Sequence, residues 1–277
     1  MVTARERLLP LYKQVRSSTL GLTDGLTAED MMLQSMEDAS PAKWHLGHTT
    51  WFFEALILDA YHSEYQRFSD QFFFLFNSYY ESLGERHPRP FRGMLSRPSL
   101  EQVLEYRHHV DQSLIELLER DNLPSECWQR LELGLHHEMQ HQELLITDQL
   151  HGFSFHRFDP IWKTLLNKPQ VSSEVSAHAW VAQAGGLVSV GMPAERGSEE
   201  FAYDCETPLH QQYLRPYCLA SRPVTNFEWL AFMSDDGYRI PSYGCLMVGP
   251  VCPEKGGKPL FIGSRRTGSG FDIPLTA

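Results

Sequence analysis

The feature that most constrains the fold is a series of four long helical segments in the first 151 residues. Their approximate ranges are 5–15, 41–61, 99–118 and 124–151. In the first and third, apolar residues recur at intervals of three and four, as in helices that bury one face. Ser40 before Pro41, and Ser99 before Gln102, are typical helix starts. Helices of this length predict a four-helix bundle, whose core is a common place for metal sites.

The pattern changes at about Ala177, where β-branched and apolar residues are interrupted by glycines. Short strands are expected there, with one short helix near residues 224–233. We therefore predict an α+β multidomain chain with a helical bundle over residues 1–151, a connection over 152–176 and a second domain from residue 177. The segment between the second and third helices, residues 76–99, is rich in Pro, Gly and Arg and predicts a long loop with a functional role.

Composition favours small-molecule chemistry. The 277 residues carry 24 Lys plus Arg against 35 Asp plus Glu, a formal charge of -11, which argues against nucleic acid or an anionic membrane as the main partner. The five cysteines form no CxxC pair, and no secretory leader is apparent, so a disulfide framework is not expected. No segment reaches the roughly 18 consecutive apolar residues of a membrane span. A cytoplasmic setting is expected.

A candidate metal site lies on the fourth helix, in the sequence HHEMQHQELL. His137 and His141 are four residues apart and so lie on one helical face, where two imidazoles can chelate one cation. His48 on the second helix is placed to supply a third imidazole across the bundle. Glu138 and Glu143 are expected to orient the ligands. Such a site leaves open positions on an iron or zinc ion.

Other histidines are expected to be structural or exposed: His45, His108, His109 and His136.

The same residues also match a second motif. Residues 137–141 read HExxH, the helix motif of zinc metalloproteases, in which the glutamate is the general base. That motif expects a third ligand later in the chain and a sheet before the helix. Here the candidate third ligand, His48, comes earlier, and the preceding segments are helical. The sequence therefore favours a mononuclear non-haem iron site over a protease zinc site.

Three separated motifs together resemble one enzyme family. WHLGHTTWFFE over residues 44–54, the loop of residues 76–99 and HHEMQHQELL over residues 136–145 resemble the ergothioneine-biosynthesis sulfoxide synthases of the EgtB type, in the family order. The resemblance covers nearly all of residues 5–243. It implies a DinB-like bundle followed by a formylglycine-generating-enzyme-like domain, which is related to C-type lectins. Residues 185–191 and 201–233 resemble the start of that second domain.

The resemblance implies roles for six residues. His48, His137 and His141 would be the iron(II) ligands, and Gln140 would help to hold hercynine, the trimethylated histidine substrate. Arg89 and Arg92 would hold the carboxylates of the thiol substrate, a task that suits planar guanidinium groups. The implied reaction uses dioxygen to join a cysteine-type thiol to the imidazole of hercynine as a sulfoxide. Cys205 departs from the family pattern, where Asn is expected, and nothing explains it.

The resemblance stops after Tyr243, where the family pattern would continue with WLSDGWA. Reading the third base of each codon with the first two of the next permits that heptapeptide over residues 243–250. We therefore expect a one-base deletion near codon 243, with residues 244–277 as an out-of-frame tail. The second domain would then span only 177–243 and be incomplete. Sequencing the locus tests this, because a genuine divergent terminus would have no WLSDGWA in the shifted frame.

The family's catalytic tyrosine would lie in the missing region, so no catalytic residue is assigned and activity of this chain is in question. Three alternatives stay open: an ovothiol-pathway synthase that joins cysteine to unmethylated histidine, a zinc-dependent hydrolase or thiol-transferase, and a non-catalytic remnant. The sequence does not distinguish cysteine from γ-glutamylcysteine as the thiol, and it leaves the oligomeric state open.

Overall fold

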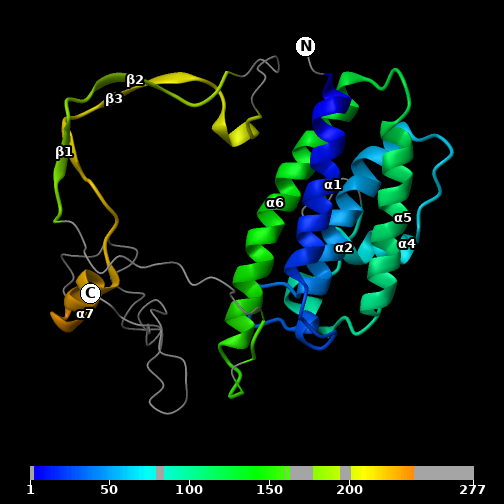
Figure 1. The fold of residues 1–277 in the computed structure, drawn as a ribbon, viewed down its shortest axis with the longest axis horizontal. Helices are drawn as coiled ribbons and strands as arrows, with labels where there is room; N and C mark the ends of the chain where they lie inside the picture. Colours follow the sequence, from blue (N-terminus) through cyan, green and yellow to red (C-terminus); the bar gives the residue numbers. More distant parts are fainter. Residues whose placement is uncertain (1–2, 79–83, 159, 163–176, 194–200, 240–277) are drawn as a thin grey trace. The chain divides into compact units, whose positions relative to one another are not determined.

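The computed structural model describes residues 3–78, 84–158, 160–162, 177–193 and 201–239. The chain divides into two compact units, residues 1–166 and 167–277 (Figure 1). The expected out-of-frame tail, residues 244–277, lies outside the described residues.

The first unit is built from helices, as predicted. The long ones are α1 (Ala4–Leu22), α2 (Ala42–Phe53), α5 (Leu100–Leu118) and α6 (Ser125–Phe153). In Figure 1, α1 lies along α6, and α2 packs against both α5 and α6. The predicted helix start at Ser99 is confirmed and is a capping box: the Ser99 side chain accepts from the Gln102 amide, and the Gln102 side chain accepts from the Ser99 amide. The first helix runs seven residues beyond Val15 because Arg16 and Thr19 also face the interior.

The second helix contains an unpredicted wide turn. After α2 the chain continues through a π-helical segment, η2 (Glu54–Leu58), into α3 (Asp59–Tyr61), so the expected helical stretch to Tyr61 is confirmed. The Glu54 carboxylate is fully buried and accepts hydrogen bonds from the Tyr65 and Tyr106 hydroxyls and the Phe68 amide. These donors satisfy polar oxygens that burial would otherwise leave without partners.

The segment between the second and third helices is mostly irregular but contains two short helices. A 3-10 helix, η1 (Asp30–Met32), precedes α2, while α4 (Asp70–Phe76) and the 3-10 helix η4 (Arg89–Met94) follow it. Phe72 and Phe76 are buried and pack against the core of the bundle. The short helix α4 was not predicted, because DQFFFLF is apolar nearly throughout and has no helical period.

Gly47 on α2 provides a test of this packing. A Cβ atom at this position would lie 2.3–2.5 Å from three ring atoms of buried Phe76. Gly47→Ala is therefore expected to destabilise the protein by roughly 1–3 kcal/mol through overpacking, although alanine is the better helix former. Urea unfolding measures the change.

Gly21 on α1 is the matched control, since its nearest neighbour would be 3.9 Å away. Gly21→Ala should stabilise the protein by up to about 1 kcal/mol. Equal effects of the two substitutions would contradict the packing around Phe76.

The second unit contains a long antiparallel ribbon. Its strands are β1 (Trp180–Gln183), β2 (Gly186–Val190), β3 (His210–Leu214) and β4 (Tyr217–Ala220). β1 pairs with β4, and β2 pairs with β3. The two pairs keep the same register, but the strand pairing is interrupted near Gly185. Gly185 has φ +71°, and a Cβ there would lie 2.4 Å from the Leu214 carbonyl oxygen, so the interruption requires glycine. Short helices η5 (Asp204–Glu206), α7 (Asn226–Ser234) and η6 (Gly237–Arg239) complete the described part.

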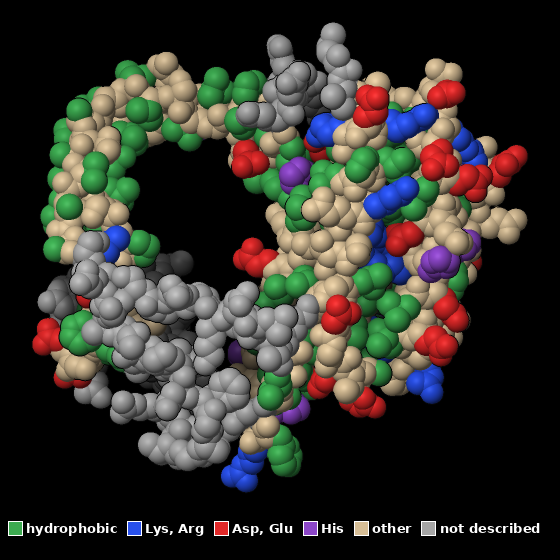
Figure 2. Space-filling view, in the orientation of Figure 1, with side chains coloured by type: hydrophobic (Ala, Val, Ile, Leu, Met, Phe, Trp, Pro, Cys, Tyr) green, Lys and Arg blue, Asp and Glu red, His purple; other side chains and the backbone are tan. Residues whose placement is uncertain are grey.

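The predicted change to short strands and the helix near residues 224–233 are thus confirmed. The strand-containing region has no buried hydrophobic side chain among its described residues, 177–193 and 201–239. Trp180, Leu187, Tyr213 and Leu219 are each more than 60% exposed (68%, 66%, 64% and 63%), and the hydrophobic side chains along the ribbon are visible in Figure 2. Within the described part of the chain, neither pair of strands is covered by the second layer that a stable sheet packs against.

Candidate metal centre

Three histidines from two helices converge inside the first unit. His48 lies on α2, and His137 and His141 lie one turn apart on α6. Their candidate ligand atoms all lie within 4.8 Å of one another, and their ring centroids are 4.5–5.1 Å apart. Within the described residues, no other group of three His, Cys, Asp or Glu side chains meets so closely. The predicted three-histidine site is therefore present.

His48 is held in one orientation. It is 2% exposed, and its Nδ1 lies 2.6 Å from the Phe76 carbonyl oxygen, to which it donates a hydrogen bond. The Trp44 ring stacks on it at 4.5 Å with an interplanar angle of 13°. Because Nδ1 carries the proton, Nε2 holds the lone pair that a metal ion needs.

The His137 ring has a buried nitrogen without a hydrogen-bond partner among the described residues, and a metal ion would satisfy it. Its ring stacks on Phe52 at 4.6 Å, and its Nδ1 is buried without a hydrogen-bond partner in the described part of the chain. A buried polar atom without a partner is unfavourable unless something else binds it. The donor set of three imidazole nitrogens fits a divalent transition metal such as iron or zinc.

His141 contacts His45, whose role the sequence did not predict. Its Nδ1 lies 2.8 Å from Nδ1 of His45, whose Nε2 lies 3.2 Å from Oδ2 of Asp148. His45 was expected to be structural or exposed. It is 2% exposed and contacts a candidate ligand directly. The only sequence signal was its position three residues before His48, one turn along the same helix.

All three imidazoles are neutral at pH 7. Burial lowers the pKa of His137 to about 4 and the pKa values of His48 and His141 well below 6.5, and the neighbouring histidines lower them further. A neutral imidazole binds a metal without first losing a proton. Three neutral ligands leave the ion its full charge and open positions for anionic ligands.

The lowered pKa values predict that the metal-free protein loses stability on acidification. The unfolded chain, with histidine pKa values near 6.5, binds more protons than the folded chain between pH 6.5 and the folded pKa of about 4 for His137. The free energy of unfolding must then rise with pH in this window and fall as the solution is made acidic. Urea unfolding at pH 7.0, 6.0 and 5.0 should show a steady decrease. Equal stability at the three values would contradict the burial of neutral imidazoles.

Glu138 does not act as expected. Its carboxylate is fully buried and accepts hydrogen bonds from Arg16 (2.9 Å), Arg107 (2.6 Å) and Thr19 (2.6 Å). Burial alone would raise the pKa of Glu138, but Arg107 and Arg16 lower it to about 2. Its two oxygens are engaged by these donors, which corrects the expectation that it orients a ligand. Glu143 is exposed.

The same contacts weaken the protease interpretation. A general base must approach a metal-bound water and have a pKa near the working pH. Glu138 is instead fixed between two guanidinium groups and remains ionised down to a pH of about 2. The HExxH match is therefore incidental to hydrolytic chemistry, since its glutamate stabilises the helix packing.

The expected substrate-binding residues lie in different surroundings. Arg92 is 5% exposed, its Cζ lies 3.4 Å from the centroid of the Trp44 ring, and it donates to the hydroxyls of Ser40 and Ser78. Its charge reaches the centre, where it contributes to lowering the pKa values of His48 and His141.

Arg89 and Gln140 are nearer the surface. Arg89 binds the carbonyl of Asp38 and pairs with its carboxylate at 3.9 Å. Gln140 is exposed on α6, directly before His141.

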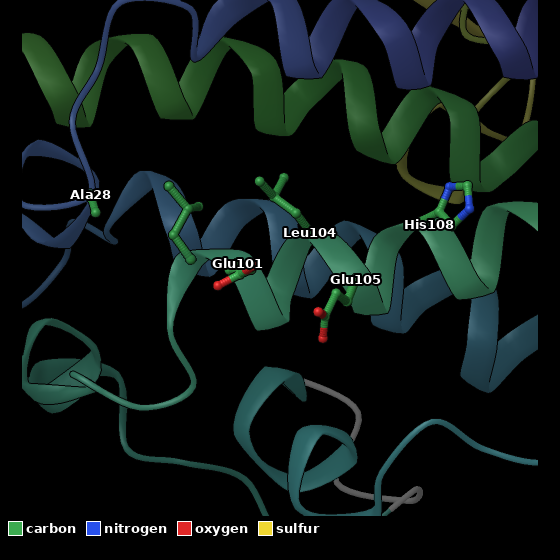
Figure 3. A pocket seen from close by; sticks show the side chains of 6 residues that line it. Ala28, Glu101, Leu104, Glu105 and His108 are labelled. Atoms are coloured by element: carbon green, nitrogen blue, oxygen red, sulfur yellow. The ribbon is translucent and has the colours of Figure 1, made fainter.

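A groove elsewhere on the bundle is separate from the histidines. It is lined along α5 by Leu100, Glu101, Leu104, Glu105 and His108, and by Ala28 from the segment between α1 and η1 (Figure 3). None of the three histidines lines it, so the groove is not part of the metal centre. Among the described residues, every helix is too short or too polar to cross a membrane.

The comparison with protein families identifies the helical unit. Residues 11–145 match the model of the DinB superfamily. No curated protein matches the chain. The matched range includes His48, His137 and His141 and most of the helices that place them. Residues 11–145 of this chain therefore form a DinB-like domain.

Proposed function

We propose that the chain derives from an iron(II)- and oxygen-dependent sulfoxide synthase of ergothioneine biosynthesis, of the EgtB type. The observation that carries the proposal is the convergence of His48 with His137 and His141, the same three residues that the motif resemblance names as iron ligands. A carboxylate-free ligand set with open positions suits a reaction in which several substrates must bind together. The formylglycine-generating-enzyme-like nature of the strand-containing region is part of this proposal.

The proposed reaction balances without another oxidant. The S–H bond of the thiol and the C2–H bond of the hercynine imidazole are broken, and a C–S bond and an S=O bond form. Dioxygen accepts four electrons, and its second oxygen leaves as water with the two hydrogens. Iron(II), when bound, would hold the thiol, the imidazole and dioxygen close together.

Arg92 is the chain's own group best placed to bind an acidic substrate. Its guanidinium is buried between Trp44 and two serine hydroxyls, and its charge acts on the histidine cluster. A carboxylate of the thiol substrate would bond more strongly to Arg92 than neutral hydroxyls do. Arg89 would assist from the surface loop, and Gln140 would contact hercynine from α6.

A zinc-dependent hydrolase or thiol-transferase is a second candidate, favoured by the three-histidine donor set. Zinc with three protein ligands keeps an open position for water or thiolate. The engagement of Glu138 by Arg16 and Arg107 disfavours the version in which this glutamate is the base.

Activity with defined metals separates the candidates. The chain and a frame-repaired version would be loaded anaerobically with Fe(II), then given oxygen, hercynine or histidine, and cysteine or γ-glutamylcysteine. The repaired chain is expected to form the C–S product, detected by mass, with Fe(II) and not with Zn(II). A product from histidine would favour the ovothiol-pathway synthase. Failure of both chains to form any C–S bond would refute the proposal.

A further inference from the structure

We propose that His45 and Asp148 are positioning residues that fix the tautomer of His141, so that its Nε2 points to the metal ion. This inference concerns the metal centre itself and goes beyond the proposed reaction. It rests on three hydrogen-bonding contacts among described residues.

The contacts form a continuous line from the backbone to His141. The Ser40 amide donates to Oδ2 of Asp148 at 2.8 Å and fixes the carboxylate. The same oxygen lies 3.2 Å from Nε2 of His45, and Nδ1 of His45 lies 2.8 Å from Nδ1 of His141. Asp148 follows His141 by seven residues, or two turns, and therefore lies on the same face of α6.

The direction of each hydrogen bond follows from the carboxylate. An ionised carboxylate only accepts, so Nε2 of His45 must carry the proton that it donates to Asp148. Nδ1 of His141 is engaged by His45, so His141 can bind a metal ion only through Nε2, and a neutral imidazole bound in that way carries its proton on Nδ1. A neutral ring protonated on Nε2 has an acceptor at Nδ1, so Nδ1 of His141 must be the donor.

The consequence for His141 is that its lone pair lies on Nε2. The opposite tautomer would place two lone pairs against each other at 2.8 Å and put a proton on Nε2, the ring nitrogen that His45 does not contact. His48 reaches the same state by a different contact, since its Nδ1 donates to the Phe76 carbonyl oxygen. Two of the three ligands are thus set to present Nε2 before any metal binds. Such partners of ligating histidines raise metal affinity.

Two amide substitutions distinguish the contact made by Nδ1 of His45 from the contact made by its Nε2. Asparagine places its amide oxygen near the position of Nδ1 and keeps an acceptor for His141, whereas glutamine places its amide near Nε2 and keeps only the contact with Asp148. His45→Gln is expected to weaken Zn(II) and Co(II) binding by about 10- to 100-fold, and His45→Asn by less than about tenfold. Affinities would be measured by competition with a chelating dye.

The tautomers are read directly by long-range ¹H–¹⁵N NMR of the metal-free protein. We expect the proton on Nδ1 of His141 and on Nε2 of His45 in the wild type, and loss of the single tautomer of His141 in His45→Gln. A merely structural role for His45 would not move this signal. The wild-type spectrum tests the inference even if a variant fails to fold.

His151 provides the matched control. It also lies on α6, and its Nδ1 lies 2.7 Å from the Ser35 hydroxyl, away from the cluster. His151→Gln and His151→Asn should leave metal affinity unchanged. Equal losses for His45→Asn and His45→Gln, or a His141 protonated on Nε2 in the wild type, would overturn the proposal. Neither measurement depends on turnover, so the absence of a C–S product would refute the proposed function and leave this inference standing.

Discussion

Replacing His137 by phenylalanine is expected to abolish tight metal binding while the bundle stays folded. Phenylalanine keeps the ring that stacks on Phe52 at 4.6 Å but has no nitrogen to bind a metal ion. Substituting a residue that merely supports a ligand typically weakens metal binding 10- to 100-fold, so loss of a ligand should exceed about 100-fold. The remaining His48 and His141 would hold an ion through only two nitrogens.

The same variant should be more resistant to acid in its metal-free form. It removes the buried Nδ1 that has no partner among the described residues and an imidazole whose pKa is lowered to about 4. The decrease in stability between pH 7 and pH 5 should therefore be smaller than in the wild type. Functional sites commonly reduce stability in this way, because a ligand set is arranged for its ligand.

Isothermal titration with Zn(II) and urea unfolding measure the two effects. His136→Phe is the matched control, since it changes the neighbouring histidine of the same helix, which is outside the cluster. It should bind metal like the wild type. Equal metal affinity of the His137 and His136 variants would show that the cluster does not bind the ion.

The helical unit could be predicted well because its signals are local. Helical periodicity and helix-start residues act within a few turns, and they placed the starts of α2, α5 and α6 to within about two residues. The expected side-chain cap is present at Ser99, but Ser40 does not cap α2, whose N-cap residue is Pro41. The pairing of His137 with His141 follows from helix geometry alone. The third ligand, His48, was a candidate from its place on the second helix and was supported by the resemblance between motifs, because periodicity does not state which helices are neighbours.

What could not be predicted depends on contacts between distant segments. His45 and Asp148 are 103 residues apart, and only the packing of α2 against α6 brings them together. The π-helical turn is stabilised by hydroxyls of Tyr65 and Tyr106 from other elements. Likewise, nothing local indicated that Arg16 and Arg107 would meet around one carboxylate.

The second large effect is expected at that carboxylate. In Glu138→Gln the side chain keeps its shape but loses its charge, which leaves the buried guanidinium groups of Arg16 and Arg107 without the anion between them. Removing one member of a buried ion pair typically costs about 3–5 kcal/mol of stability. Urea unfolding at pH 7 measures this change in the free energy of unfolding. The control is Glu143→Gln, at an exposed position of the same helix, which should change stability by less than about 0.5 kcal/mol.

This substitution also decides what the HExxH match means. If Glu138 were the general base of a zinc hydrolase, Glu138→Gln would remove activity and leave stability nearly unchanged, because catalytic groups are seldom needed for folding. The structure predicts the opposite result for Glu138→Gln: a large loss of stability, while the unaltered histidines still bind the metal ion under native conditions. Replacing Arg107 by methionine in the Glu138→Gln background should recover part of the loss, since one buried cation is then removed. A stable Glu138→Gln protein would show that the two arginines do not depend on this carboxylate.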